Sequence, residues 1–400
     1  MKSAVAFTDE IDYLDRACEE LASGIKDQLT FGKSSLGIVF CDADVVVEEL
    51  GRRLHQSLGI NIIGATTTAS IERNSGYHDM GIVLSVVTGD DVDIAIGCSG
   101  ELQMERFSEQ MQTAYDKAVA SLGSAPKFIY LCSPYAADTT SDTYLNALDA
   151  LSDHTPIFGG VATDHYDLQY AKTFLNGEAF SKCVIFAIFA GNIRPVFAME
   201  HEFCGKTMSK GVVTKATGNQ VERVGDRTFL EYLANITPVP DEEVVIFHFQ
   251  STPFLMEMPD YEQHEQPVMR ALFTVNHETG AGGFLSQMPE GSVLSINILQ
   301  RENLVGSSEA TLSSLYTAMQ GNPDYNYSLI LVSSCNARHL LMADTKDLET
   351  NVLIKKLADV APDLHVAGYY SFGEICPTAV DAQGKAKNRF HNVSFTACAF

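Results

Sequence analysis

The feature of this sequence that most constrains its fold is an order of strand-like and helix-like segments that recurs along the chain. The first round contains a strand pattern at 36–40, a helix at 45–58, and strands at 61–64, 81–88 and 92–97. The second contains helices at 104–122 and 141–151 and strands at 128–132, 157–161, 172–174, 183–190 and 196–203. Short apolar runs between amphipathic helices predict an α/β fold with mixed sheets.

A third round occupies the end of the chain. It runs through strand 293–299, helix 309–319, strand 329–332, helix 348–360 and strands 364–368 and 393–398. This order repeats that of residues 92–190, and internal duplication is the economical explanation. We therefore expect mixed sheets with α+β character, in two related α/β domains. The apolar strand 393–398 is expected inside a sheet, although it lies almost at the terminus.

Length divides the chain further, because 400 residues exceed one ordinary core. Residues 1–33 are expected to form an appended N-terminal helix, since Ile11, Leu14, Cys18, Leu21, Ile25 and Leu29 recur at helical spacing. We place an N-terminal domain at 34–230 and a C-terminal domain at 231–400. The proline-rich, acidic stretch 237–243 is expected to be a connector.

Charge and cysteine usage limit the function classes. The net charge of −24 disfavours nucleic acid and anionic membrane surfaces as partners. The longest apolar run, Cys183 to Ala190, is far too short to cross a bilayer. No secretory signal is visible, and the nine cysteines contain no Cys-x-x-Cys pair. These features lead us to expect a cytoplasmic protein.

Two stretches near the C-terminus bring chemistry-bearing residues together. The apolar run Leu329–Val332 is followed by Ser334, Cys335, Arg338 and His339. A strand, a turn and a helix start would aim backbone amides and the positive end of a helix dipole at one spot. The second stretch, residues 366–375, adds a carboxylate at Glu374. We therefore expect a pocket that attracts anions, with an opposite charge nearby.

Several short motifs carry a family resemblance. Ser-Cys-x-x-Arg at 334–338, Gly-Tyr-Tyr-Ser-Phe-Gly-Glu-Ile at 368–375 and Phe-His-Asn at 390–392 resemble the C-terminal FIST domain. Ile-Ile-Gly-Ala-Thr-Thr at 62–67 and Pro-Ile-Phe-Gly-Gly-Val-Ala-Thr-Asp at 156–164 resemble the N-terminal FIST domain. The resemblance covers about residues 34–400. It implies a sensory protein that binds a small ligand and acts in signal transduction, with FIST-like domains at 34–230 and 231–400.

The preferred hypothesis for the ligand is an amino-acid-like zwitterion. Arg338 and helix amides would hold its carboxylate, and Glu374 would hold its ammonium group. The alternative left open is that Arg338 and Glu374 only form a buried structural ion pair. The expected ligand-binding residues are Ser334, Cys335, Arg338, Tyr370, Gly373, Glu374 and Asn392.

Two other functions remain alternatives. Cys335 and His339, four residues apart, would share a helix face, so the protein could be an enzyme with Cys335 or a nearby serine as nucleophile and Glu374 orienting the histidine. The family resemblance also implies a haem-binding nitric-oxide sensor that regulates a histidine kinase, with His391, His339 or His165 as the iron ligand. The chain contains no recognisable output module, so a sensor would act through a separate partner.

Other apparent motifs are rejected. The runs Gly32-Lys33-Ser34 and Gly205-Lys206-Thr207 lack the first glycine of a phosphate-binding loop. No His-Glu-x-x-His or comparable ligand spacing exists, so we expect no dedicated metal site and no certain cofactor.

Overall fold

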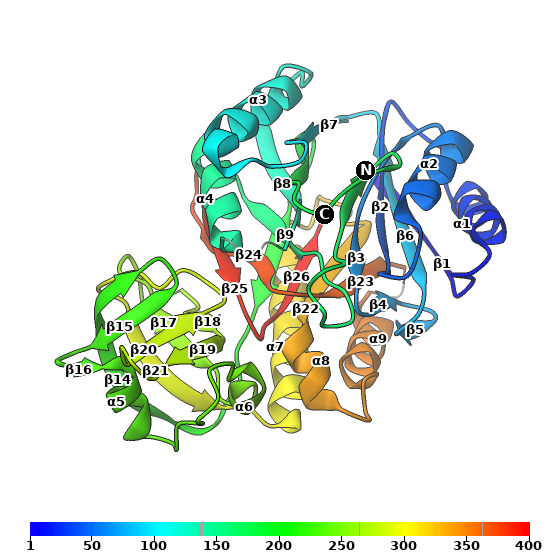
Figure 1. The fold of residues 1–400 in the computed structure, drawn as a ribbon. Helices are drawn as coiled ribbons and strands as arrows, with labels where there is room; N and C mark the ends of the chain where they lie inside the picture. The colour runs from blue at the N-terminus through cyan, green and yellow to red at the C-terminus, as the bar shows by residue number, and fades with distance from the viewer. Residues whose placement is uncertain (136–138, 264, 362) are drawn as a thin grey trace.

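Three six-stranded sheets and one inserted eight-stranded sheet organise the chain (Figure 1). The computed structural model describes residues 1–400 apart from 136–138, 264 and 362. The mixed α/β class predicted from the sequence is confirmed.

The first sheet has the strand order β1-β6-β2-β3-β10-β11. Its strands are β1 (Lys2–Thr8), β2 (Ser34–Asp42), β3 (Asn61–Thr67), β6 (Ile82–Gly89), β10 (Thr173–Leu175) and β11 (Glu178–Phe180). Strands β2 and β3 are parallel and the other pairs are antiparallel. Helices α1 (Leu14–Gln28) and α2 (Val47–Leu58) cover one face.

The other two large sheets repeat this order. The second is β7-β12-β8-β9-β24-β25, from β7 (Val92–Cys98), β8 (Pro126–Ser133), β9 (Ile157–Val161), β12 (Ile185–Gly191), β24 (Glu374–Val380) and β25 (Ala386–His391). The third is β13-β26-β22-β23-β4-β5, from β13 (Val196–Met199), β22 (Leu329–Cys335), β23 (His365–Ser371), β26 (Phe395–Ala399), β4 (Ser70–Glu72) and β5 (Gly76–His78). Parallel pairs β8–β9 and β22–β23 match β2–β3. The repetition that the sequence analysis expected is thus present, and in the structure it comprises three units.

In each repeated unit, one β-hairpin leaves its own sheet and joins the sheet of a neighbouring unit. The hairpin after β3 joins the third sheet, the hairpin after β9 joins the first, and the hairpin after β23 joins the second. Their first residues, Ser70, Thr173 and Glu374, pair with Tyr369, Ala65 and Gly160, respectively. This cyclic exchange binds the three units into one body.

One glycine recurs at the same place in all three parallel pairs. A Cβ added to Gly64, Gly159 or Gly368 would lie 2.6, 1.9 or 2.6 Å from the facing carbonyl oxygen of Val39, Leu131 or Val332. No other residue fits such a close backbone approach. The glycines thus mark equivalent positions, four residues before Thr68, Thr163 and Phe372.

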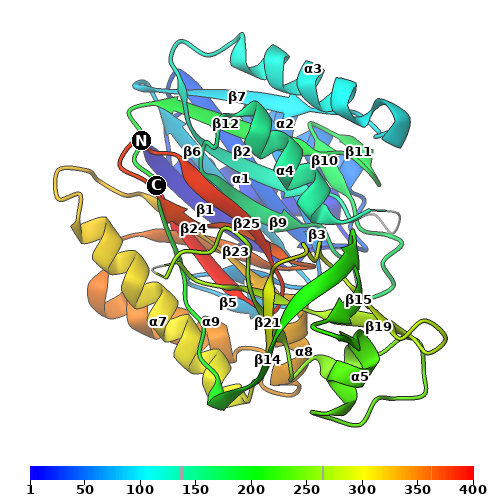
Figure 2. The same ribbon diagram turned by 90° about the vertical axis from the view of Figure 1, so that its left-hand side faces the viewer.

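Side chains alternate between a shared centre and three outer layers. Inward residues such as Phe40, Tyr130 and Leu331 meet in one central cluster. Outward residues pack under helices on the outer faces of the three sheets. These helices also include α3 (Phe107–Val119) and α4 (Ser141–Leu151) on the second sheet, and α7 (Arg301–Gln320) and α9 (Leu348–Val360) on the third. Figure 2 shows α3 at the top and α7 and α9 at the lower left, outside the sheets.

A separate β-rich segment is inserted between β13 and α7. It contains β14 (Cys204–Thr217), β15 (Gln220–Val224), β16 (Arg227–Thr228), α5 (Phe229–Ala234), α6 (Ile246–Phe249), β17 (Phe254–Glu257), β18 (Val268–Arg270), β19 (Leu272–Asn276), β20 (Ala281–Phe284) and β21 (Val293–Ile298). It has its own apolar core. Its ends meet, because Cys204 pairs with Ile298. We call residues 204–298 the insert and the rest the three-unit core (Figure 1).

Most predicted elements are present with shifted ends. Strand β26 lies between β13 and β22, as expected for an internal strand. The N-terminal helix is confirmed as α1, but β1 precedes it and pairs with β6, which the sequence reading did not anticipate. The domain boundaries at 33/34 and 230/231 stay predictions. In the part of the chain that the structure describes, no helix is long and apolar enough to span a membrane.

Candidate functional site

A cavity of about 230 Å³ lies between the three-unit core and the insert. The core side consists of Tyr166, Leu168, Cys335, Asn336, Ala337, Leu340, Phe372, Asn392 and Val393. The insert side consists of Val244, Ile246, Phe247, Phe249, Gln250, Ala271, Leu272, Phe273 and Leu285. None of these lining residues carries a charge. Two of them, Val244 and Phe247, are more than half exposed, so the cavity is bordered by solvent on the side of α6.

Asn336 lies where all three units meet. It is the first residue of α8 (Asn336–Met342), and its Nδ2 donates to Thr68 Oγ1 at 2.7 Å and to Thr163 Oγ1 at 2.9 Å. Both threonine hydroxyls donate to the carbonyl oxygen of Asp164, so they must accept from Asn336. This fixes the orientation of the amide. Its Oδ1 is buried and has no hydrogen-bond partner among the described residues.

Asn392 presents the opposite polarity. Its Oδ1 accepts hydrogen bonds from Ser286 Oγ at 2.6 Å and from the Ala271 backbone N–H at 3.3 Å, both in the insert. Since a backbone N–H only donates, the oxygen must face it. The Nδ2 of Asn392 is left buried without a described partner. Two residues of the cavity lining therefore carry a buried, unpaired acceptor and a buried, unpaired donor, each costing roughly 1–3 kcal/mol while unsatisfied.

Backbone strain is concentrated in the same wall. Tyr166 has a φ of 73° and Val393 a φ of 59°, in the left-handed region that bulky and β-branched residues avoid. The loop of Tyr166 is held by Asp164, whose carboxylate accepts the N–H groups of Leu168, Gln169 and Tyr170, each at 2.9 Å. Strain that the surroundings enforce is typical of binding sites.

His339 supports Tyr166 from behind. Its Nδ1 is 2.6 Å from the Tyr166 hydroxyl, and its Nε2 is 2.7 Å from the Tyr77 hydroxyl. Burial lowers the pKa of His339 to about 4, so the ring is neutral near pH 7. A neutral imidazole donates through one nitrogen and accepts through the other. His339 thus links two tyrosines and positions one wall of the cavity.

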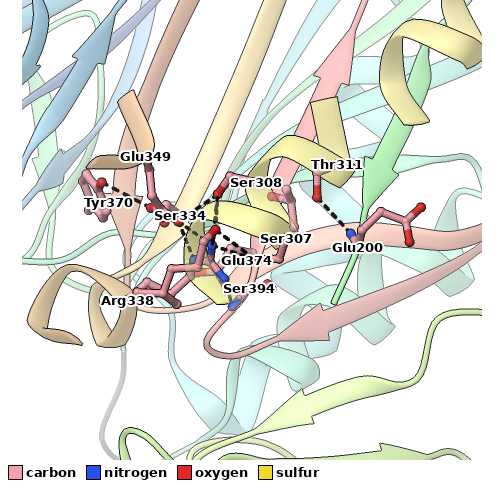
Figure 3. Close-up of polar contacts among 12 residues, drawn as sticks. Glu200, Ser307, Ser308, Thr311, Ser334, Arg338, Glu349, Tyr370, Glu374 and Ser394 are labelled. Carbon is pink, nitrogen blue, oxygen red and sulfur yellow. Dashed lines mark hydrogen bonds and ion pairs between the residues drawn. The ribbon is translucent and has the colours of Figure 1, made fainter. Parts of the chain in front are cut away.

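Arg338 is paired with Glu349, which corrects the sequence-based alternative of an Arg338–Glu374 ion pair (Figure 3). Its Nε donates to Glu349 Oε1 at 2.7 Å, and its Nη2 donates to the same oxygen, to the Leu304 carbonyl and to Ser307 and Ser308. The two charged side chains are 1% and 0% exposed. Arg338 is therefore occupied and lies outside the cavity lining.

Glu374 is held by two serines, of which Ser394 is labelled in Figure 3. It also lies outside the cavity lining. It accepts from Ser371 Oγ at 2.8 Å, Ser394 Oγ at 2.6 Å and the Ser394 N–H at 3.1 Å. Burial raises the pKa of Glu374 to about 8, and the serine hydrogen bonds oppose the shift only in part. Because Glu374 accepts two hydrogen bonds from Ser394, it also fixes the strained neighbouring residue Val393.

The remaining predicted binding residues divide into two groups. Cys335 and Asn392 line the cavity. Ser334 and Tyr370 do not, since their hydroxyls donate to Glu349 Oε2 at 2.6 and 3.3 Å. Gly373 has a φ of 132°, and an added Cβ would lie 2.2 Å from the Phe390 ring. Of the residues predicted to bind the ligand, Cys335 and Asn392 therefore line the cavity, and the other five lie outside its lining.

The arrangement does not favour nucleophilic catalysis by Cys335. Burial, followed by the charge of Glu374, raises the pKa of its thiol well above the usual range. Both nitrogens of His339 are hydrogen-bonded to tyrosines rather than to the sulfur. The thiol is therefore protonated and packs as an apolar group.

The three histidines proposed as haem ligands do not fit that role. None lines the cavity. His391 is 0% exposed, and its Nε2 lies 3.0 Å from the Cys376 carbonyl oxygen. His165 lies on the surface, 3.2 Å from Asp42. Asp42, Asp44 and His165 have ligand atoms within 4.8 Å of one another, and they are the described residues that could hold a cation.

Of the residues that line the cavity, the sequence analysis had named only Cys335 and Asn392 as binding residues. Asn336 was seen only as part of a helix start, and no residue of the insert was proposed. A signal was available in the aromatic residues Phe247, Phe249 and Phe273, but in a sequence such residues look like ordinary core. Only the folded chain places them opposite Asn336.

A repeated α/β core that holds an uncharged cavity against an inserted sheet defines a small-molecule-binding protein. Two family models match the chain: the FIST N domain over residues 35–227 and the FIST C domain over 229–377. The protein belongs to the FIST domain family, whose domains are sensory, ligand-binding domains of signal transduction.

No curated protein matches the sequence. Among solved structures, the chain is similar to a cyanuric acid hydrolase with 9% identity and a TM-score of 0.27, covering 74% of this chain and 99% of that one. The enzyme from A. caulinodans has 8% identity and a TM-score of 0.32, and the match covers 100% of this chain and 98% of that one. T. maritima PurL complexed with FGAR has 8% identity and a TM-score of 0.21, and the match covers 99% of this chain and 72% of that one. These TM-scores are too low to indicate a shared fold.

Proposed function

We propose that this protein is a sensor for a small, uncharged and largely apolar molecule with an amide-like polar edge. The observation that carries the proposal is the wall of the cavity, which has no charged side chain and includes Asn336 and Asn392, whose buried Oδ1 and Nδ2 atoms have no partner among the described residues. An amide group offers both a donor and an acceptor. The aromatic residues of α6 and β19 suit a flat ligand body.

A zwitterionic amino acid suits this wall less well. Burying a carboxylate or an ammonium group without an opposite charge is costly, and Arg338 already holds Glu349. At about 230 Å³, the cavity is also smaller than the roughly 300–1,000 Å³ typical of pockets for drug-sized ligands. A compact neutral ligand satisfies both limits.

The position of the cavity suggests how binding is read out. Its two walls belong to the three-unit core and to the insert, so an occupant stabilises one docking of the insert on the core. Binding that favours one arrangement shifts the population towards it. We propose that a separate signalling protein, such as a histidine kinase, recognises this ligand-stabilised arrangement.

A thermal-shift series tests the ligand class. Benzamide, phenylacetate and L-phenylalanine share an aromatic ring and differ in being neutral, anionic and zwitterionic. We expect benzamide to raise the Tm progressively with concentration, because a ligand that binds only the folded state stabilises it by mass action. Phenylacetate and L-phenylalanine should leave the Tm unchanged. A shift with L-phenylalanine and none with benzamide would overturn the proposal.

Two variants connect the shift to the cavity. Ala337→Phe fills the space, and Asn336→Leu removes the unpaired acceptor while the Thr68 and Thr163 hydroxyls keep donating to Asp164. Both should abolish the benzamide shift. Asn146→Leu is the matched control, since Asn146 is exposed and does not line the cavity. Equal benzamide shifts in all three variants would place binding elsewhere.

A further inference from the structure

Two of the nine cysteines lie in direct contact. Cys98 is the last residue of β7, and Cys183 stands two residues before β12. Their sulfur atoms are 3.5 Å apart. The contact is on the second sheet and involves none of the residues that line the cavity.

The surrounding backbone holds the two thiols in place. Strands β7 and β12 are paired in register, with Cys98 opposite Ile185. The Ser99 N–H donates to the Val184 carbonyl at 3.1 Å, and the Val184 N–H donates to Ser99 Oγ at 3.1 Å. A disulfide needs sulfurs about 2.05 Å apart, so the two sulfurs must approach further before a bond forms.

The two thiols differ in exposure and acidity. Cys98 is partly exposed and Cys183 is fully buried. A hydrogen bond from Cys183 lowers the pKa of the Cys98 thiol to about 7, whereas the same contact and burial raise the pKa of Cys183. Cys98 is therefore the thiol suited to attack an oxidant from solvent, and Cys183 is in position to attack Cys98 afterwards because its sulfur is 3.5 Å away.

We propose that Cys98 and Cys183 form a redox-modification site at which a small hydroperoxide closes a disulfide. The Cys98 thiolate attacks the peroxide, a sulfur–oxygen bond forms and the oxygen–oxygen bond breaks, which gives a sulfenic acid. The departing hydroxide or alkoxide takes a proton from solvent and leaves as water or an alcohol. The Cys183 sulfur then attacks Cys98, the sulfur–sulfur bond forms, and the departing hydroxide takes the Cys183 proton as water. One peroxide accepts the two electrons that the dithiol loses.

The crosslink would join segments that are 85 residues apart in the sequence. The enclosed chain includes α3, β8, α4 and β9. It also contains the loop of Tyr166, which the Asp164 carboxylate holds by hydrogen bonds. Cys183 is also hydrogen-bonded to β10, a strand of the first sheet, because Thr173 Oγ1 donates to the Cys183 carbonyl oxygen at 2.7 Å. The site therefore lies where the second unit meets the first sheet.

Mass spectrometry of the native protein treated with hydrogen peroxide tests the proposal. The wild-type chain should lose two hydrogen atoms, and digestion should give a peptide pair linked through Cys98 and Cys183 that dithiothreitol separates. Cys183→Ser should stop at the sulfenic acid and trap a dimedone adduct on Cys98. Cys98→Ser should show neither product. Cys204→Ser, at the other partly exposed cysteine, should behave like the wild type.

Three results would overturn the proposal. These are the absence of the linked peptide pair in the oxidised wild-type protein, its formation only after denaturation, and equal oxidation of Cys183 in the Cys98→Ser variant. Because the first readout uses the unaltered chain, it stands even where a variant fails to fold.

Discussion

At the scale of single residues, Arg338 shows how this fold keeps a charge away from water. Glu349 accepts from Arg338, Ser308, Ser334 and Tyr370, so both of its oxygens are occupied. Burying such a pair costs desolvation free energy, but removing one partner costs more because it leaves the other charge buried and unpaired. Its role is to fix α8, which carries Asn336 into the cavity wall.

We expect Arg338→Met to lower the free energy of unfolding by about 3–5 kcal/mol, because it leaves Glu349 buried without its counter-charge. Removing both charges in Arg338→Met/Glu349→Leu should recover part of this loss. The free energies are obtained from urea unfolding of the ligand-free protein. Arg389→Met, at a partly exposed pair with Asp260, is the control and should cost less than about 1 kcal/mol. A single variant as stable as the wild type would return Arg338 to the list of ligand-binding residues.

Residue types and spacing were enough to find the Arg338–Glu374 region but not to assign its partners. Glu349 was part of an ordinary helix pattern, and nothing in the sequence distinguishes it from other surface-type acids. Only the packing of α9 against α7 and α8 brings its carboxylate to Arg338. The sequence thus drew attention to Arg338 and Glu374, which lie outside the cavity lining, while the uncharged residues in contact with the cavity were largely missed.

At the scale of elements, β24 carries an acid where the other borrowed hairpins carry neutral residues. Glu374, Ser70 and Thr173 occupy equivalent positions at the starts of the three hairpins. Among the strands of these hairpins, the sequence pattern predicted β10 at 172–174, whereas β4 and β25 are too polar to stand out as apolar runs. The exchange of hairpins between units was not predictable either, since pairing between borrowed hairpins depends on contacts distant in sequence.

Glu374 should give the protein a measurable pH dependence. Its pKa is raised to about 8 in the folded state, above its ordinary value when unfolded. The unfolded chain therefore loses this proton first, and stability falls as pH rises towards 8. Relative to Glu374→Gln, the wild-type protein should lose roughly 1.4 kcal/mol per pH unit between about pH 5.5 and 7, and progressively less per unit as pH passes through 8. Urea midpoints at several pH values measure this difference, and parallel curves for the two proteins would contradict the shift.

At the scale of the whole molecule, the insert has the properties of a separable part. It has its own apolar core, and its two ends are paired at Cys204 and Ile298. None of its strands enters the three large sheets. Strand β26, by contrast, lies inside the third sheet and hydrogen-bonds on both sides.

Replacing residues 204–298 by a short Gly-Ser linker should therefore leave a folded three-unit core, because the linker spans only the distance between paired strands. The shortened chain should melt cooperatively at a lower Tm, since the contacts of Arg270 with Asp142 and the Phe390 carbonyl are lost. It should show no benzamide shift, because one wall of the cavity is gone. Deleting 395–400 is the opposite control and should abolish soluble expression, because the third sheet loses an internal strand. Circular dichroism and thermal melts distinguish these outcomes: a shortened chain without a cooperative transition would show that the insert and the core fold as one unit.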